Sequence, residues 1–307
     1  MKRDCRLIAT LPSLSNLKKV QEVFESDCVD EVRFNTGVHV PFAAEEALDI
    51  LQRLSLKYDK KLWIDVKGRQ LRISKWADPL YSCIELNHHV EVLYPAEVCF
   101  RNGDRVRIAH IKDGNKLFVE PLPKEALGAG QSVNIIGRDV EIDGYLTEKD
   151  KEYLTACAKL GMPWIMASFV EEFLDFMEIL TLQPNAQIMA KIESLKGMEL
   201  VTRHPSVLME KFNIFSLMAA RDDLYIQTGE NCSMLKHLKA IVDVDSGAVC
   251  ASRIFPSLER RQTPEFADYA DLELMYSMGY RRFMLCDNIC NYHFEKAIKA
   301  WKEFQHG

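Results

Sequence analysis

The sequence contains no C-x-x-C pair, no long hydrophobic run and no internal repeat. Its nine cysteines are scattered and odd in number, which favours reduced thiols over a disulfide framework or a zinc site. No apolar stretch approaches the roughly 18 residues that a membrane helix needs. The apolar run near the N-terminus is too short for a signal peptide. We therefore expect a cytoplasmic protein that has no membrane partner.

An excess of positive charge is also missing, because the formal net charge is −6. This balance argues against a nucleic-acid partner, although local basic clusters could still hold a small anion. Hydrophobic residues make up 48% of the chain and charged residues 27%, as in ordinary soluble proteins. A chain of 307 residues is long enough for one large domain and a small insert.

Short, almost continuously apolar runs recur along the chain. They cover residues 5–10, 30–35, 61–66, 163–168, 187–193, 213–220, 248–254 and 281–287. Runs of this length are typical of parallel strands that are covered on both faces. Helical patterns lie between most of them. The alternation predicts an α/β fold, a (β/α)8 TIM barrel, formed by residues 1–72 and 146–307.

The connection after the third run is much longer than the others. It holds three alternating segments that are separated by Asn102-Gly103-Asp104 and Asp113-Gly114-Asn115, which are turn sequences. We therefore expect a small antiparallel β domain over residues 73–145, inserted after strand three. Barrel enzymes carry their sites at the C-terminal strand ends, where such an insert would act as a lid.

Lys191 and Glu193 stand two residues apart where the fifth run ends. Side chains two apart on a strand point the same way. A surface strand could place such a pair in solvent for solubility. A barrel strand could use the pair in a site for a metal and for acid–base chemistry.

Several short motifs, taken in order, resemble the pyruvate kinase family. They are "LIATLP", "VRFNTG", "IDVKGRQLR", "GAGQSVNIIG", "LTEKDKEYL" with "MPWIMASFV", "KIESLKGME", "MAARDDL" and "CASRIFPSLE". The resemblance spans nearly all of the chain. It implies a barrel with a β lid after strand three, here with a shortened lid and without the family's C-terminal regulatory domain.

The resemblance also implies roles for individual residues. Lys191 would stabilise negative charge on a transferred phosphoryl group and on an enolate. Ser252 would help to relay a proton at the enol carbon. Glu193 and Asp223 would hold Mg²⁺ or Mn²⁺, for which hard oxygen ligands are suited. Arg33 would hold phosphate. Arg72 would reach nucleotide phosphates. The other implied substrate-binding residues are Asn35, Asp65, Lys67, Arg221 and Asp222.

Departures from the family pattern cluster around the anionic substrates. Asn35 and Asp65 match two ligands of the family's monovalent-cation site, but Gly37 and Val66 replace the other two, which argues against K⁺. Asp222 replaces a glycine whose amide would face the substrate carboxylate, so we expect its charge to repel that group. Nucleotide binding is left open, and ordinary phosphorylation of ADP is not expected.

The retained residues predict a divalent-metal-dependent transferase or lyase. It would act on a small enolpyruvyl or α-keto-acid anion through a metal-bound enolate, and we expect a homo-oligomer. Two alternatives stay open. One is a catalytically inactive pyruvate kinase homologue that binds a small anion or serves as a subunit. The other is a barrel enzyme of the pyruvate aldolase or lyase type.

Overall fold

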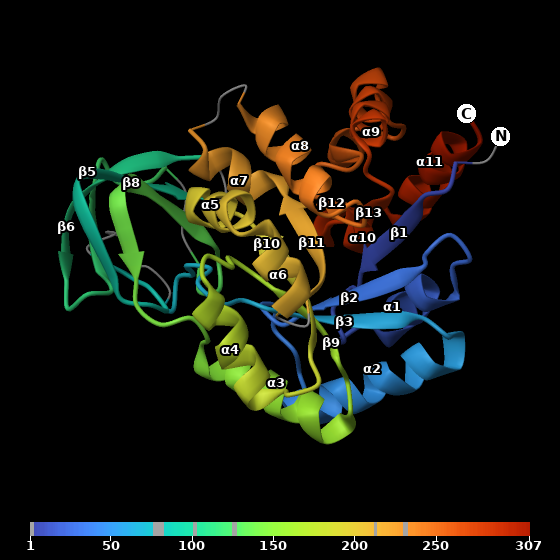
Figure 1. Cartoon of the computed structure of the whole chain (residues 1–307), viewed down its shortest axis with the longest axis horizontal. Coiled ribbons are helices and arrows are strands. Elements are labelled where there is room, and N and C mark those ends of the chain that lie inside the picture. The colour runs from blue at the N-terminus through green and yellow to red at the C-terminus, as the bar shows by residue number, and fades with distance from the viewer. Residues whose placement is uncertain (1–2, 76–82, 101–102, 125–127, 212–213, 230–232) are drawn as a thin grey trace. The chain divides into compact units, whose positions relative to one another are not determined.

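The computed structural model describes residues 3–75, 83–100, 103–124, 128–211, 214–229 and 233–307. The chain divides into two compact units (Figure 1). The first unit comprises Met1–Val66 and Lys151–Gly307, and the second comprises Lys67–Asp150. The second range encloses the insert that the sequence placed at 73–145.

The described residues of the first unit form a closed barrel of parallel strands. Its strands, in sequence order, are β1 (Arg6–Thr10), β2 (Glu31–Asn35), β3 (Lys61–Val66), β9 (Trp164–Ala167), β10 (Gln187–Ile192), β11 (Ile214–Ala220), β12 (Val249–Ala251) and β13 (Arg282–Leu285). Around the barrel the order is β1-β13-β12-β11-β10-β9-β3-β2, so each strand pairs with its neighbours in sequence and the last closes onto the first. Each apolar run became one barrel strand, and the predicted (β/α)8 fold is confirmed.

Helices surround this barrel in Figure 1. They are α1 (Leu17–Glu25), α2 (Ala44–Tyr58), α3 (Glu148–Leu160), α4 (Phe173–Leu182), α5 (Leu195–Arg203), α6 (Pro205–Lys211), α7 (Arg221–Gln227), α8 (Met234–Val244), the 3-10 turn η1 (Pro256–Glu259), α9 (Phe266–Met278), α10 (Asp287–Tyr292) and α11 (Phe294–His306). Local sequence fixes several of their starts. Asn16 caps α1, and capping boxes open α4 and α9. Helices on the outside leave the strand ends free to carry a site.

The interior of the barrel holds one apolar layer below a polar one. The apolar layer consists of Ile8, Trp63, Met166, Met189, Met218, Val249, Ala251 and Met284, all buried. Because side chains two apart on a strand share a face, the residue two further along each strand also points inward. In four strands that residue is polar and buried: Thr10, Asp65, Ser168 and Lys191. The sequence therefore places a polar layer at the C-terminal end of the barrel.

The opposite end of the barrel carries a separate ion pair. Arg282 bonds both carboxylate oxygens of Glu31 at 3.1 Å and also donates to Ser216. Asp245 accepts the Ser216 hydroxyl at 2.9 Å. Polar groups at this N-terminal face of a barrel belong to stability rather than to catalysis.

The described part of the second unit is a five-stranded antiparallel sheet. Its strands are β4 (Ile84–Glu85), β5 (Val90–Phe100), β6 (Arg105–Lys112), β7 (Lys116–Glu120) and β8 (Val133–Ile142), in the order β4-β7-β6-β5-β8. Asp113 and Gly114 have positive φ between β6 and β7, as a tight hairpin turn requires. The other predicted turn begins at Asn102, which lies outside the described residues. An inserted antiparallel β domain after strand three is thus confirmed.

Two global expectations concern thiols and membranes. Cysteines in the described part of the chain carry thiols that are not joined in disulfides: Cys5, Cys28, Cys83, Cys99, Cys157, Cys250, Cys286 and Cys290. Within the same part, no helix is both long enough and apolar enough to cross a membrane.

Candidate functional site

Asp65 lies at the centre of the polar layer and is fully buried. Its Oδ2 accepts hydrogen bonds from Arg33 Nε at 2.8 Å and from Arg33 Nη2. Its Oδ1 accepts the Ser168 hydroxyl at 3.1 Å and Lys191 Nζ at 3.4 Å. A buried charge persists only when it is paired and hydrogen-bonded. Asp65 therefore fixes the positions of Arg33 and Lys191.

Lys191 extends from β10 into this layer. Its Nζ donates to Ser168 Oγ at 2.7 Å and lies 3.3 Å from Glu193 Oε1. Burial alone would lower the pKa of the ammonium, but Asp65 and Glu193 outweigh burial and raise that pKa. Lys191 is thus a protonated, oriented cation at neutral pH.

Glu193 follows β10 and is almost completely buried. Its Oε2 accepts the Phe169 backbone N–H at 2.7 Å. Phe169 has a φ of 48°, a left-handed conformation that is costly for such a residue and recurs at functional sites. The pKa of Glu193 is raised to about 7, and burial is the largest cause. The charge of Asp223 adds to the rise, and the charge of Lys191 only partly opposes it. Glu193 therefore titrates near neutral pH.

The Arg33 guanidinium is held by four hydrogen bonds. Besides the two to Asp65, Nη1 donates to the Thr10 hydroxyl and to Asp287 Oδ2, each at 3.0 Å. Asp287 Oδ1 accepts the side-chain amide of Asn35 at 2.8 Å. Burial opposes the charge, but Asp65 and Asp287 raise the pKa of Arg33. Asp287 thus bridges the two side chains that the sequence placed at the substrate anion.

A second cluster surrounds the loop that follows β12. Arg221 Nη2 donates to the Ser252 carbonyl at 2.7 Å, and Nη1 donates to Asp271 Oδ1 at 2.8 Å. Ser252 and Arg253 both have left-handed φ, 65° and 54°. The buried Arg221 guanidinium therefore holds the backbone that carries the Ser252 hydroxyl in an unusual conformation.

Asp222 makes an ion pair at the edge of this cluster. Its Oδ1 lies 2.7 Å from Arg253 Nε, and both side chains are about half exposed. The Arg253 guanidinium also lies over the Tyr225 ring, 4.7 Å from its centroid. The charge of Asp222, expected from the sequence to repel a substrate carboxylate, is thus offset by Arg253.

Lys67 and Arg72 belong to the second unit. The Lys67 N–H donates to Asp150 Oδ1 at 2.7 Å. Arg72 Nε and Nη2 donate to Gln70 Oε1, and Nη1 donates to the Gly130 carbonyl at 2.7 Å. Arg72 therefore makes three hydrogen bonds within its own unit.

Three residues of the site were missed by sequence reasoning: Thr10, Ser168 and Asp287. Two of them could have been found, because Thr10 and Ser168 stand two residues beyond Ile8 and Met166 in apolar runs. Asp287, the first residue of α10, gave no such signal. Its partner Arg33 lies 254 positions away in the sequence.

The family resemblance implies a divalent metal ion held by the carboxylates of Glu193 and Asp223. Within the described ranges, no group of three or more His, Cys, Asp or Glu side chains is arranged to hold a metal ion. Burial is the main cause of the raised pKa of Glu193, and the charge of Asp223 adds to it, so the two carboxyl groups interact. Mg²⁺ and Mn²⁺ commonly take one or two carboxylates and complete their shell with substrate oxygens and water. The pair therefore fits a divalent ion whose other ligands are not protein groups.

The side-chain oxygens that K⁺ would need are already hydrogen-bonded or are missing. Both oxygens of Asp65 are bonded to Arg33, Ser168 and Lys191. Asn35 Oδ1 accepts the Gly37 N–H at 3.0 Å. Gly37 and Val66 carry no side-chain oxygen, so two of the four side-chain ligands that the family pattern implies for a monovalent cation are missing.

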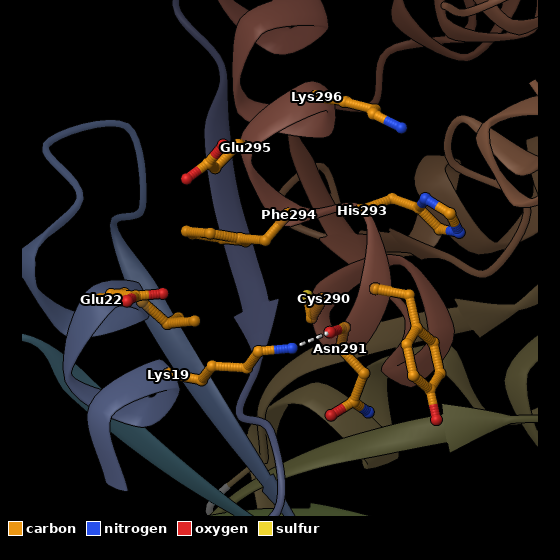
Figure 2. A pocket seen from close by; sticks show the side chains of 10 residues that line it. Lys19, Glu22, Cys290, Asn291, His293, Phe294, Glu295 and Lys296 are labelled. Atoms are coloured by element: carbon orange, nitrogen blue, oxygen red, sulfur yellow. Dashed lines mark hydrogen bonds between the residues drawn. The ribbon is translucent and has the colours of Figure 1, made fainter. Parts of the chain in front are cut away.

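A separate cavity of about 190 Å³ lies between α1 and the junction of α10 and α11 (Figure 2). Lys19, Glu22 and Glu295 line it, and Lys19 Nζ donates to the Asn291 carbonyl at 3.0 Å. None of the described residues that line this cavity is one of the predicted site residues.

Comparison with known proteins gives the family. The model for "Pyruvate kinase, barrel domain" matches residues 92–288. The pyruvate kinase of Agrobacterium vitis is 30% identical over 176 residues, which are 55% of this chain and 34% of that protein. That of Borreliella burgdorferi is 20% identical over 309 residues, 91% of this chain and 63% of its own. Pyruvate kinase 1 of Saccharomyces cerevisiae is 27% identical over 245 residues, 68% and 47% of the two chains.

The chain belongs to the pyruvate kinase family. It spans less than two thirds of the length of each of these pyruvate kinases. The segment matched to the pyruvate kinase barrel contains Lys191, Glu193, Asp223 and Ser252, whereas Arg33 precedes it.

Proposed function

We propose that this member of the pyruvate kinase family is a divalent-metal-dependent enzyme that forms and reprotonates the enolate of an α-keto acid of the pyruvate class. One observation carries the proposal: Lys191 and Glu193 form a buried pair at 3.3 Å, at the C-terminal end of a barrel strand. Asp223 lies close enough to raise the pKa of Glu193. Such a concentration of buried charge at this end of a barrel supports catalysis rather than solubility.

Glu193 and Asp223 would hold the divalent ion. When bound, it would supply positive charge to the substrate carboxylate and to the keto oxygen. Glu193 is ready for this role above neutral pH, where its carboxyl group is ionised. The Phe169 N–H keeps one of its oxygens oriented at 2.7 Å.

Lys191 would face the keto oxygen on which negative charge develops. Ser168 and Asp65 fix its Nζ before substrate arrives, so little reorganisation is needed during the reaction. The C3–H bond of the keto acid breaks, its electron pair forms the C2–C3 double bond, and the carbonyl pair moves onto oxygen. The proton leaves to the Ser252 hydroxyl, which passes its own proton to solvent. Return of a solvent proton to C3 regenerates the keto acid.

A second candidate is the catalytically inactive homologue that binds a small anion. The specific observation in its favour is that Arg33, expected to hold phosphate, already has four internal hydrogen bonds. An inactive protein would keep the buried ion pairs for stability and would give no exchange at C3.

Proton NMR of pyruvate in D₂O separates these two candidates. The wild type with Mg²⁺ is expected to replace the methyl protons with deuterium, and EDTA should stop the exchange. Lys191→Met should lower the rate by about 10²–10³-fold, the usual effect of removing one charge-stabilising group. Lys196→Met, which changes an exposed lysine on α5, is the matched control and should leave the rate unchanged. Absence of metal-dependent exchange in the folded wild type would favour the inactive homologue.

A further inference from the structure

Asp287 is the more exposed of the two acidic partners of Arg33. Its two oxygens accept hydrogen bonds from Arg33 Nη1 at 3.0 Å and from Asn35 Nδ2 at 2.8 Å. Its side chain is 30% exposed, whereas that of Arg33 is 8% exposed and that of Asp65 is buried. Asp287 therefore lies between solvent and the two donors that an incoming anion would use.

The charges of the site favour a small anion of low charge. Arg33 and Lys191 provide two positive charges, and the four carboxyl groups near them are those of Asp65, Glu193, Asp223 and Asp287. A divalent ion would bring a fully ionised cluster only to neutrality. A monoanion such as pyruvate would then leave one excess negative charge. A phosphorylated substrate would leave two or three, in a buried site where charges interact more strongly than in water.

Asp287 is not needed to keep Arg33 and Asn35 in place. Asp65 accepts two hydrogen bonds from Arg33, and Thr10 accepts a third. Asn35 Oδ1 is anchored by the Gly37 N–H. Without Asp287, both donors would stay oriented toward the position that its carboxylate now occupies.

We propose that Asp287 is a specificity-determining residue that occupies the anion-binding side of Arg33 and Asn35, so that the site takes unphosphorylated α-keto acids and excludes phosphate-bearing ones. The proposal rests on the proposed function for its substrate class. The exclusion of phosphate can be tested independently of that function. Asp287 acts as an internal anion: a phosphate oxygen would have to displace it from both donors while remaining close to its charge.

The test is direct binding of inorganic phosphate, without added metal and at constant ionic strength, by isothermal titration calorimetry. Asp287→Asn removes the charge and keeps the shape. It is expected to bind phosphate at least about tenfold more tightly than the wild type, a difference typical of removing one like charge at close range. Asp287→Glu keeps the charge and should still exclude phosphate. Asp49→Asn removes an exposed carboxylate on α2 and should behave as the wild type.

Equal phosphate affinity in the wild type and in folded Asp287→Asn would overturn the proposal, as would a gain of the same size in Asp49→Asn. If Asp287→Asn does not fold, the shorter Asp287→Ser provides the same comparison. Phosphate binding by the wild type that is lost in Arg33→Met would also overturn it. In a parallel titration with Mg²⁺, pyruvate should bind the wild type, and Asp287→Asn should tighten pyruvate binding by less than it tightens phosphate binding, because pyruvate carries less negative charge. Failure of pyruvate to bind either protein would count against the proposed function, while the phosphate titrations would still decide the role of Asp287.

Discussion

Glu193 offers a test of the site that needs no substrate. Burial raises its pKa from 4.5 to about 7 in the folded protein, with Asp223 adding to the rise. Between these values the folded protein keeps a proton that the unfolded chain releases. The contribution of Glu193 to stability is therefore complete below pH 4.5 and is lost as the pH rises through about 7. Since one pKa unit is worth 1.36 kcal/mol, the loss at pH 8 is on the order of 3 kcal/mol.

Glu193→Gln should remove this dependence, because glutamine resembles the protonated acid at every pH. With EDTA present, the free energy of unfolding from urea titrations is measured at pH 5, 6.5 and 8. The difference between the variant and the wild type should shift in favour of the variant by up to about 3 kcal/mol between pH 5 and pH 8. Glu199→Gln, at an exposed position on α5, is the control and should show a constant difference.

The same carboxylate predicts the effect of metal. Mg²⁺ at pH 8 should restore stability to the wild type but not to Glu193→Gln, because ligand binding to the folded state alone adds to its stability. The affinity for Mg²⁺ should rise as the pH rises through about 7, since the ligand must be ionised. Parallel pH profiles for the wild type and Glu193→Gln, together with equal Mg²⁺ affinity, would refute both the raised pKa and the metal role.

Three further predictions concern the surroundings of the site. In a lactate-dehydrogenase-coupled assay, pyruvate formation from phosphoenolpyruvate and ADP should fall well below the roughly 1–100 per second of ordinary kinases; turnover in that range would contradict the proposed restriction. Exchange into pyruvate should be the same in potassium and choline buffers, because Asp65 has no free oxygen for K⁺; a K⁺ requirement would contradict this geometry. Arg221→Met should lower the free energy of unfolding by about 1–3 kcal/mol, since it removes the hydrogen bonds from Arg221 to the Ser252 carbonyl and to Asp271; no measurable change by urea titration would show that the loop after β12 does not depend on Arg221.

The barrel could be predicted from the sequence because each strand is a buried apolar run with its own boundary. The run at 187–193 became β10, Gln187–Ile192, and the run at 61–66 became β3 without change. The short helices α5 to α7 were harder, because they have only seven to nine residues, too few for a periodic pattern to be decisive. Their positions are set by packing against the barrel rather than by local pattern.

The site was predictable only where its residues follow the period of a strand. Lys191 and Glu193 stand out because two ionisable residues two apart end an apolar run. That Lys191, Ser168 and Arg33 all converge on Asp65 depends on the lateral order β10-β9-β3-β2 of the barrel strands, which no local pattern encodes. The resemblance to pyruvate kinase named Arg33 as a phosphate ligand, and this role stays a prediction. Its bond to Asp287 became visible only when β2 and α10 were placed side by side.

Two side-chain ligands for K⁺ are missing, and Arg33 is hydrogen-bonded to Asp65 within the protein. Both features have one electrostatic cause. Asp65 is a fully buried carboxylate and requires positive charge beside it. Gly37 and Val66 provide no side-chain oxygen for a monovalent ion, and the positive charge beside Asp65 comes from Arg33 and Lys191. Positive charge that neutralises Asp65 is no longer fully available to a substrate, and Asp287 reduces it further at the exposed edge. Under the proposed function, a site arranged in this way would stabilise one developing negative charge on an enolate and would have little positive charge left for two phosphate-bearing anions that must meet in line.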